Sequence, residues 1–313
     1  MAVAPDLIDR FRADLAALVG WQDHLRLGIA VSGGADSLAL LLIASEALPD
    51  RIAAATVDHG LRAGAAEEAQ FVAAICAERA IPHTTLTVAV EAAGDGLQAA
   101  ARHARYVALE AWRRESGLSL VATAHHADDQ AETLLMRASR GAGVSGLAGI
   151  RAVNGTLVRP LLGWRRAELE SVVRAAGLTF VDDPSNRDPR FDRSRMRQLL
   201  ADAPDLDVAG LASSAANLAA AAQALDWVAD RLWIERVSAG PAEVRIDAAE
   251  LPAELVHRLV RRALSVLGYQ GRADKIAPLI ARLNAGQPAS IGAILARPGA
   301  HWVFSPAPPR RFP

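Results

Sequence analysis

The stretch that decides the fold is residues 28–42, GIAVSGGADSLALLL, in which two apolar runs enclose a short polar loop. The first run has the length of a buried strand, and residues 37–48 continue as a helix. Between them stand two adjacent glycines, two hydroxyls and one carboxylate. Glycine can adopt positive φ and turn successive backbone N–H groups into one concavity, to which a helix N-terminus adds unpaired donors. The stretch therefore predicts a strand–loop–helix unit that binds an anion such as a phosphate.

Outward from this stretch, short apolar runs alternate with amphipathic segments. Strands are predicted at 25–31, 51–59, 83–90 and 118–125, and helices at 37–48, 65–79, 97–115 and 128–140. This alternation is typical of an α/β fold, here a Rossmann-like parallel sheet with helices on both faces. Ligands bind such sheets outside the carboxyl ends of the strands. The polar clusters SGGADS, VDHG and AHHADD all follow predicted strands, so we expect them to meet at one edge.

The second half of the chain changes character. Residues 140–150 are rich in glycine, 165–177 predict a helix, and 181–197 form a polar, proline-punctuated loop. From about residue 205 the chain is alanine-rich and helical, with one isolated strand at 242–248 and a further helix at 252–268. A chain of 313 residues suggests about two domains. We predict a nucleotide-binding catalytic domain at 1–203 and a smaller, mainly helical domain at 204–313.

Composition narrows the class of protein. With 51% hydrophobic and 22% charged residues, the chain suits a soluble globular protein with a sizeable core. Apolar runs such as 38–44 are too short to span a bilayer, and the acid-bearing N-terminus does not resemble a signal peptide. A single cysteine, Cys76, excludes an internal disulfide and any CxxC site. These features favour the cytoplasm.

Charge is distributed unevenly along the chain. The net charge is −1, but residues 151–200 hold 10 arginines against 6 acids, a local balance of +4, whereas residues 1–150 hold 12 against 18. Basic character is thus concentrated in the segment that contains the polar loop. Such a segment favours contact with nucleic acid, although a solvated charged surface has the same composition.

The SGGADS loop offers specific chemistry. Ser32 and Ser37 add hydroxyl donors suited to phosphate oxygens, and Asp36 can hold Mg²⁺ beside a polyphosphate. The GxxxxGK[ST] spacing of a Walker loop is not present. The alternative is an ordinary strand–turn–helix in which Ser37 caps the helix.

The HHADDQAET segment, residues 125–133, opens a predicted helix. Helical spacing puts Asp128 and Glu132 on one face, with His125 and Asp129 on a neighbouring one. Acids in a first turn favour the helix dipole, but two adjacent aspartates and a glutamate exceed that need and suggest a nearby cation. His126 could orient a nucleotide or accept a proton, or could be an ordinary polar contact.

Two further stretches carry weaker signals. His59, in VDHGLR, could touch a nucleotide, although a solvated turn explains it better. Residues 97–112 place Arg102 and Arg105 in one helical stripe. A contact with phosphate is expected only if that helix borders the site; otherwise the stripe is an exposed basic face.

The ordered motifs resemble a known family. SGGxDS marks the PP-loop ATP pyrophosphatases, and VDHGLR, RHARY, HHADDQAETLLMRASRGAGVSGLAGI, RPLL and DDPSNRDPRFDRSRMR follow in the order of the tRNA(Ile)-lysidine synthetase family, over about residues 25–200. The resemblance implies the PP-loop ATPase fold, with ATP and Mg²⁺. It also implies that the cytosine carbonyl oxygen of a CAU-anticodon isoleucine tRNA attacks the α-phosphate, releasing pyrophosphate. Free L-lysine then displaces AMP to give lysidine.

The resemblance also carries roles over to matching positions. The catalytic residues it implies are Asp36, Asp128, Asp129, Glu132 and Arg105. The implied ATP-binding residues are Ser32, Gly33, Gly34, Ala35, Asp36, Ser37, His59 and His126, with Asp36 and Asp128 beside the metal. The implied tRNA-binding residues are Arg187, Arg190, Arg193, Arg195 and Arg197. Ser194 stands where the family often has Asn.

Other functions remain open on the sequence. A PP-loop tRNA thiolase generally needs paired cysteines, which one Cys76 cannot provide. An amidating PP-loop ligase leaves the basic loop unexplained, and a non-catalytic nucleotide- or RNA-binding protein leaves the intact motifs unexplained. The chain resembles the short form of the family, without an extra C-terminal domain, and relatives of this kind are often homodimers. Arg258, Arg261 and Arg262 form either a second tRNA-contacting face in the smaller domain or a solvated one.

Overall fold

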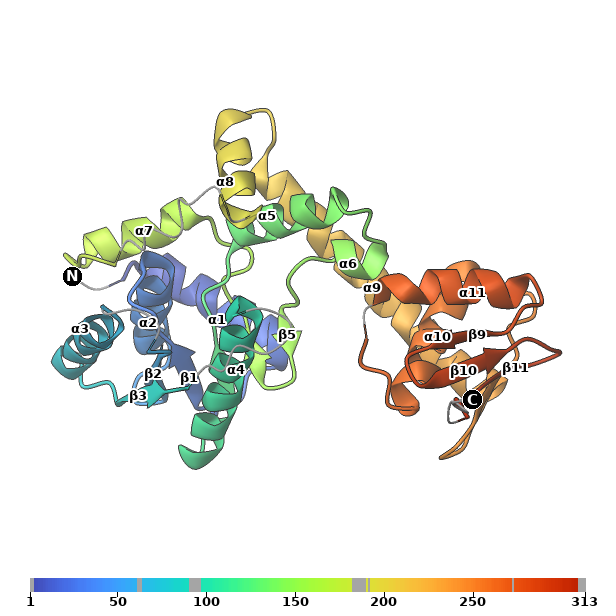
Figure 1. Ribbon diagram of the computed structural model, residues 1–313. Coiled ribbons are helices and arrows are strands. Elements are labelled where there is room, and N and C mark those ends of the chain that lie inside the picture. Colours follow the sequence, from blue (N-terminus) through green and yellow to red (C-terminus); the bar gives the residue numbers. More distant parts are fainter. Residues whose placement is uncertain are drawn as a thin grey trace. The chain divides into compact units, whose positions relative to one another are not determined.

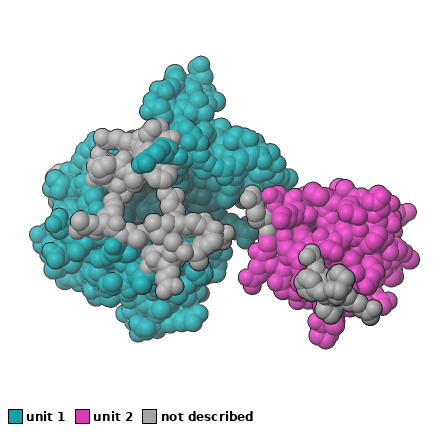
Figure 2. Space-filling view, viewed as in Figure 1, with its two compact units in different colours: residues 1–219 teal, residues 220–313 magenta. Residues whose placement is uncertain are grey.

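The computed structural model describes residues 3–60, 64–89, 97–181, 190, 192–271 and 273–308. The chain divides into two compact units, residues 1–219 and 220–313 (Figure 2). The division falls inside the long helix α9 (Val208–Arg236), whereas the boundary predicted from the sequence, 203/204, lies ahead of that helix.

A mixed sheet forms the centre of the first unit (Figure 1). In the described residues its strands follow the order β3–β2–β1–β4–β6–β5. Their bounds are β1 Leu27–Ala30, β2 Ile52–Asp58, β3 His83–Thr87, β4 Leu120–Ala122, β5 Val153–Asn154 and β6 Leu157–Val158. Every pairing between β3 and β6 is parallel, and β5 forms an antiparallel hairpin with β6. The predicted parallel α/β class is confirmed.

Helices cover both faces of this sheet. The helices of the first unit are α1 Pro5–Val19, α2 Ala35–Ala47, α3 Ala65–Glu78, α4 Leu97–Glu115, α5 Ala127–Ala138, α6 Val144–Leu147, α7 Arg166–Ala175 and α8 Asp192–Asp202. The largest hydrophobic core joins β1 to α1, α2, α3 and α7, and a smaller core joins the other face to α4. Because α2 is buried almost all round, its sequence is continuously apolar rather than amphipathic.

A glycine in β1 lets α4 lie close to the sheet. A Cβ atom built on Gly28 would stand 2.6 Å from a ring carbon of Trp112 in α4, so a side chain there would push this helix away. The close approach matters because α4 begins at the carboxyl edge of the sheet, where the polar motifs lie.

Strand order explains why those motifs meet. From β1 the chain moves to β2 and β3 on one side, and β4 and β6 then pair on the other side. In doubly wound sheets, the point where strand order reverses leaves a crevice at the carboxyl ends, here between β1 and β4. SGGADS follows β1 and HHADD follows β4, so both border this crevice.

The second unit combines helices with a small antiparallel sheet. The C-terminal part of α9, α10 (Ala253–Val266) and α11 (Ile276–Asn284) share a core with strands in the order β7–β8–β11–β10–β9. These strands are β7 Val237–Ala239, β8 Val244–Ile246, β9 Ala289–Ile291, β10 Ile294–Arg297 and β11 Trp302–Pro306. The sequence indicated the β8 segment alone. The other strands have three to five residues each, which is too short for a clear alternation of polar and apolar positions.

The three arginines of α10 differ in burial, so they do not share one surface. Arg258 is 4% exposed and pairs with Asp226 and Glu254, so it stabilises the unit from inside. Arg261 and Arg262 are exposed, and Arg262 pairs with Asp230 at 2.6 Å. The three arginines therefore do not form one solvated face.

Helix α9 passes a test of length and composition for a membrane span. Within the part of the chain that the structure describes, it is the one such helix, with a mean hydropathy of 1.3 over an 18-residue window that is 11% buried. Much of this hydropathy comes from alanine. A single helix of this kind is weak evidence for a membrane span.

Candidate active site

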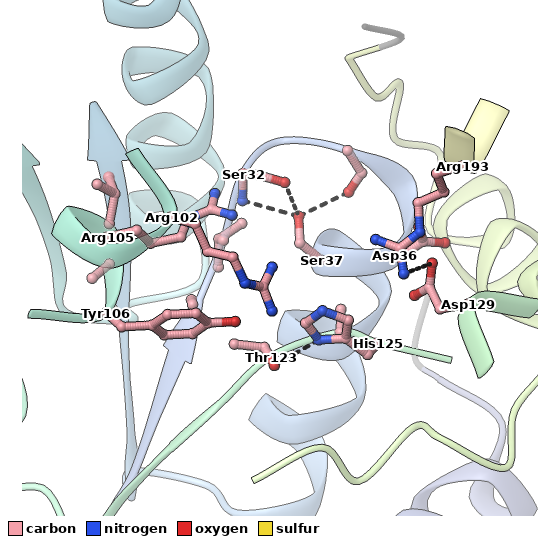
Figure 3. Close-up of a pocket in the computed structure, with 16 residues that line it drawn as sticks. Ser32, Asp36, Ser37, Arg102, Arg105, Tyr106, Thr123, His125, Asp129 and Arg193 are labelled. Carbon is pink, nitrogen blue, oxygen red and sulfur yellow. Dashed lines mark hydrogen bonds and ion pairs between the residues drawn. The ribbon is translucent and has the colours of Figure 1, made fainter. Parts of the chain in front are cut away.

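A pocket opens where β1 and β4 end (Figure 3). It encloses about 190 Å³ and is lined by the end of β1 and the loop after it, part of β2, the first half of α4, the segment after β4 and one residue of α8. The predicted clusters SGGADS and HHADD therefore contribute to one cavity with the arginines of RHARY, and VDHG contributes to it through Val57.

The SGGADS loop wraps around the start of α2. Gly33 has φ +82°, the left-handed conformation that glycine allows, and its carbonyl accepts the N–H of Val181 at 3.0 Å. Gly34 instead has φ −74° and precedes the first turn of α2. One glycine of the pair is thus needed for backbone geometry. The other lines the pocket, where the missing side chain leaves the helix N-terminus open.

The two serines of this loop differ in role. The Ser37 hydroxyl donates to the Gly34 carbonyl at 2.9 Å, accepts the Ser32 N–H at 3.1 Å, and lies 3.2 Å from the Ser32 hydroxyl. Ser37 is 7% exposed, so it mainly holds the loop in shape. Ser32 is exposed at the pocket and is the better placed of the two to meet a ligand oxygen.

Asp36 is the acid of the loop and lines the pocket. Its Oδ1 is enclosed by protein yet has no hydrogen-bond partner. A buried carboxylate oxygen in this condition is costly unless a cation or a donor from a ligand meets it. Asp36 therefore fits the predicted contact with Mg²⁺, a cation that takes oxygen ligands.

His126 lies fully buried among three carboxylates. Its Nε2 is 3.4 Å from Asp36 Oδ2 and 3.6 Å from Asp129 Oδ2, and its Nδ1 is 3.5 Å from Asp128 Oδ2. Burial lowers the pKa of His126, but the carboxylates outweigh it and raise that pKa to about 9. This predicted ATP contact therefore lies outside the lining of the pocket, and its raised pKa favours the charged form.

The preceding histidine behaves in the opposite way. His125 lines the pocket, and its Nδ1 lies 3.0 Å from the Thr123 hydroxyl. Burial lowers the pKa of His125 to about 4, so the ring is neutral at pH 7. The sequence interpretation assigned the site role to His126 instead. Alternation along the extended segment after β4, which puts positions 123 and 125 on one side, is the signal that could have found His125.

Asp128 faces the neighbouring helix α7. It accepts the backbone N–H of Arg166 at 2.8 Å and the Arg165 Nε at 3.3 Å. Burial raises the pKa of Asp128, but His126 and these donors hold it well below its usual range. Since Asp128 is not part of the lining while Asp129 is, Asp129 is better placed than Asp128 to approach a bound cation. No group of three or more His, Cys, Asp and Glu residues in the described ranges is arranged as a metal site.

Glu132 is 1% exposed and binds arginines from two helices. Its carboxylate accepts Arg193 Nε at 3.0 Å and Arg197 Nε at 2.9 Å, both from α8, and lies 3.5 Å from Arg166 Nη2 of α7. Arg193 also lies 3.7 Å from Asp129 Oδ1 and lines the pocket. Glu132, predicted as a catalytic acid, thus joins α5 to α8 by ion pairs with Arg193 and Arg197, which were predicted to contact tRNA.

Helix α4 forms the opposite wall of the pocket, across from Asp36 and Asp129 (Figure 3). It contributes Arg102, Arg105 and Tyr106, and the Arg102 guanidinium carbon lies 5.0 Å from the centre of the Tyr106 ring. Burial lowers the pKa of Arg105. Because this helix does border the site, the Arg102–Arg105 stripe has the position that a contact with phosphate requires. Arg102 was a conditional candidate for a phosphate contact, whereas Tyr106 and Thr123, like His125, were not among the predicted site residues.

The remaining predicted residues lie around this pocket or outside the description. Ala35 begins α2, and His59 follows β2 without lining the pocket. Arg195 has a side chain 52% exposed and pairs with Asp192. Arg190 is exposed ahead of α8, and Arg187 lies outside the described residues.

Comparison with known proteins identifies the family. Residues 7–203 match a PP-loop domain. The chain is 46% identical to a tRNA(Ile)-lysidine synthase of Novosphingobium aromaticivorans, covering 96% of this chain and 94% of that protein. It is 43% identical to a tRNA(Ile)-lysidine synthase of Zymomonas mobilis, covering 91% and 90%. The chain belongs to the tRNA(Ile)-lysidine synthase family. It is a ligase of that family, as the ordered motifs predicted.

A solved structure shares the fold of this chain. The U34-tRNA thiolase NcsA from Methanococcus maripaludis, determined with its [4Fe-4S] cluster, aligns with a TM-score of 0.56 and 17% identity, over 68% of this chain and 76% of that one. At this identity the likeness shows the fold alone. The single cysteine of this chain, Cys76, is buried in α3, and burial raises the pKa of its thiol to about 11, so it lacks the character of a sulfur carrier.

Proposed function

We propose that the protein uses ATP to attach free L-lysine to the wobble cytidine of the isoleucine tRNA that carries a CAU anticodon, forming lysidine. One observation carries the proposal: the SGGADS loop, the acidic start of α5 and the arginines of α4 open into a single pocket. Membership in the tRNA(Ile)-lysidine synthase family supports the reaction, and the pocket brings together groups that the reaction needs.

The first step joins the base to AMP. The cytosine carbonyl oxygen attacks the α-phosphate of ATP, and pyrophosphate leaves. Ser32, the backbone around Gly33 and Gly34, and the N-terminus of α2 bind the departing phosphates, because these donors are fixed before reaction and face the pocket. Asp36 would hold Mg²⁺, with Asp129 or the predicted Asp128 beside it. The ion supplies neutralisation of phosphate charge when bound.

The second step replaces AMP by lysine. The lysine ε-amine attacks the activated ring carbon, loses a proton, and AMP leaves with the bonding electrons. Asp129 and the neutral ring of His125 line the pocket and are the groups placed to receive that proton. Arg105, half-buried in the wall, contributes positive charge where the phosphate or the cytidine is held.

Basic residues around α8 receive the tRNA. The wobble base must leave the anticodon stack to reach an enclosed pocket, so the flanking backbone needs support nearby. Arg187, Arg190, Arg193, Arg195 and Arg197 are the proposed contacts. The Arg195 side chain is 52% exposed, more than those of Arg193 and Arg197, which already bind Glu132. We further propose that the enzyme acts in the cytoplasm and that its smaller C-terminal domain contacts the tRNA. The proposed assembly is a homodimer, which the mass in solution tests.

The test follows both products of ATP cleavage. Protein, ATP, Mg²⁺ and labelled lysine are mixed with isoleucine tRNA transcripts bearing CAU or, as a control, UAU. We expect pyrophosphate, AMP and labelled tRNA with CAU alone. Asp36→Asn should slow pyrophosphate release by about 100- to 1000-fold, the effect of removing one well-placed charge-stabilising group.

Asp50→Asn is the matched control. Asp50 is exposed at the start of β2, on the opposite edge of the sheet, and its φ of +61° is one that asparagine tolerates. This variant should retain full activity. Turnover without tRNA, or incorporation of sulfur in place of lysine, would overturn the proposed function.

A further inference from the structure

The segment from the middle of α5 to the start of α7 contains no acid. Residues 133–167 hold six arginines and no aspartate or glutamate. Three of these arginines pair with acids from outside the segment, as Arg140–Asp192, Arg165–Asp128 and Arg166–Glu132. Among the described residues, the other three, Arg137, Arg151 and Arg159, have no acid as an ion-pair partner. The segment therefore carries positive charge that the described protein does not neutralise.

The three arginines without an acid form a path that leads to the pocket. Arg159 is 5% exposed, donates from Nη1 to the Arg151 carbonyl at 2.5 Å, and has a buried Nε without a partner. Burial lowers the pKa of Arg159, and Arg102 lowers it further, although Tyr106 opposes them. Burial and Arg151 likewise lower the pKa of Arg137. Because each arginine disfavours the charge of the next, the path is continuous from Arg102 at the pocket to Arg137 in α5.

Arg151 is the exposed member of the three. Arg159 is buried, and Arg137 is half-buried and donates to two backbone carbonyls at α6 and just after it, at 2.7 Å each. From α6 the chain returns to the β5–β6 hairpin beside α4 (Figure 1), where the Thr156 hydroxyl donates to Glu110 at 2.7 Å. The path is thus fixed to α5 and to the pocket wall, and Arg151 presents its guanidinium to solvent between them.

A row of like charges suits a polyanion better than a single small anion. Cations that stand together without acids are costly for the fold, and a chain of phosphates can neutralise several of them at once. The proposed function supplies such a chain. A wobble nucleotide that leaves the anticodon stack keeps one phosphate on its 5′ side and one on its 3′ side, so the strand needs support on both sides of the pocket. The arginines of α8 are proposed for one side, which leaves the other to be supported.

Resting on the proposed function, we infer that Arg151, held by Arg159, binds the sugar–phosphate backbone of the tRNA next to the wobble cytidine. This contact lies on the side of the wobble nucleotide that α8 does not support. Arg137 and Arg159 raise the positive potential around Arg151 and need not touch the RNA. Because the contact is with phosphate, it positions the strand without reading its bases.

The test measures equilibrium binding of CAU and UAU transcripts of the isoleucine tRNA by filter binding over a series of salt concentrations. Arg151→Met should raise the Kd for both transcripts about tenfold, the effect of losing one hydrogen bond between charged groups. The slope of log Kd against log salt concentration should fall by about 0.7–0.9, the value for one phosphate contact. Arg151→Lys keeps the charge and should restore that slope.

Arg174→Met is the matched control. Arg174 lies in α7, has a side chain 67% exposed and pairs with Glu170, so its loss changes the net charge equally but outside the path. It should leave the Kd and the salt slope unchanged, and the KM for ATP should be the same in both variants.

Three outcomes overturn the inference while the proposed function stands. The first is Arg151→Met binding tRNA as tightly as Arg174→Met does. The second is a loss of binding confined to the CAU transcript, which would assign Arg151 to a base. The third is a raised KM for ATP in Arg151→Met alone, which would place Arg151 in the nucleotide site. A wild-type enzyme that transfers no lysine to tRNA overturns the proposed function itself.

Discussion

Arg193 of α8 and the arginines of α4 line the same pocket but meet different surroundings. Arg193 and Arg197 of α8 both donate to the buried carboxylate of Glu132. Arg102 and Arg105 of α4 face no carboxylate among the described residues within ion-pair distance. Residues of one type, in two helices rich in arginine, thus have two physical roles.

The difference shows how charge can be divided between stability and binding. A buried carboxylate shared by several arginines fixes the helices that carry them, because removing any partner leaves charge without compensation. An arginine without a partner gains little for the fold and instead raises the affinity of the pocket for an anion. His126 belongs to the first kind, since three carboxylates surround it.

The largest effect is expected from a substitution that breaks the ion pairs between Glu132 and the α8 arginines. Glu132→Ala removes the common acceptor of three arginines and creates a cavity beside α5. The free energy of unfolding should therefore fall by about 3–5 kcal/mol, as measured by chemical denaturation. Glu170→Ala, which removes the half-buried partner of the exposed Arg174 in α7, should cost at most about 1 kcal/mol. Equal losses in the two variants would show that the Glu132 pairs do not fix α8.

A smaller effect concerns the internal cation, His126. Its pKa is about 9 in the folded protein and about 6.5 when unfolded, so its charge stabilises the fold below pH 6.5, and this contribution is lost as pH rises through 9. His126→Gln cannot titrate. The difference in unfolding free energy between wild type and His126→Gln should therefore shrink by about 3 kcal/mol from pH 6 to pH 9.5.

Comparing the two proteins at each pH also removes the effect of His125. The pKa of His125 is about 4 in the folded state and about 6.5 when unfolded. Both proteins therefore lose folding stability in the same way as pH falls from 6.5 toward 4. A difference that does not shrink between pH 6 and pH 9.5 would show that the pKa of His126 is not raised in the folded protein.

The smallest effect on the free energy of unfolding is expected for the α4 arginines, and comparing Arg105 with Arg197 tests the two roles directly. Arg105→Met removes a cation that burial disfavours, so the free energy of unfolding should change by less than about 1 kcal/mol and can rise. Lysidine formation should nevertheless fall strongly. Arg197→Met, the same change on the paired side, should lower stability by about 1–3 kcal/mol, because Glu132 loses a donor. A larger loss of stability in Arg105→Met than in Arg197→Met would contradict the assignment of roles.

Much of the first unit follows from local pattern. Residues 28–42 consist of two apolar runs around a short polar loop, a pattern that predicts a strand, a tight turn and a buried helix. The structure has the strand at β1, the turn at Gly33 and the helix at α2. The small sheet of the second unit was mostly missed, because β9, β10 and β11 are short and are stabilised by pairing with one another. Pairing of that kind leaves little periodicity in any one segment.

By itself, the sequence determined the order of the main strands and helices of the first unit, the edge of the sheet at which the motifs gather, and the family to which they belong. Tertiary structure decided which charges are satisfied. Glu132 meets Arg193 and Arg197 across 61 and 65 residues of chain, and of two adjacent histidines one enters the pocket while the other lies beneath it. Motif spacing cannot specify such choices, because a side chain's charge partners depend on how distant helices pack, and burial then sets the energy of each pair.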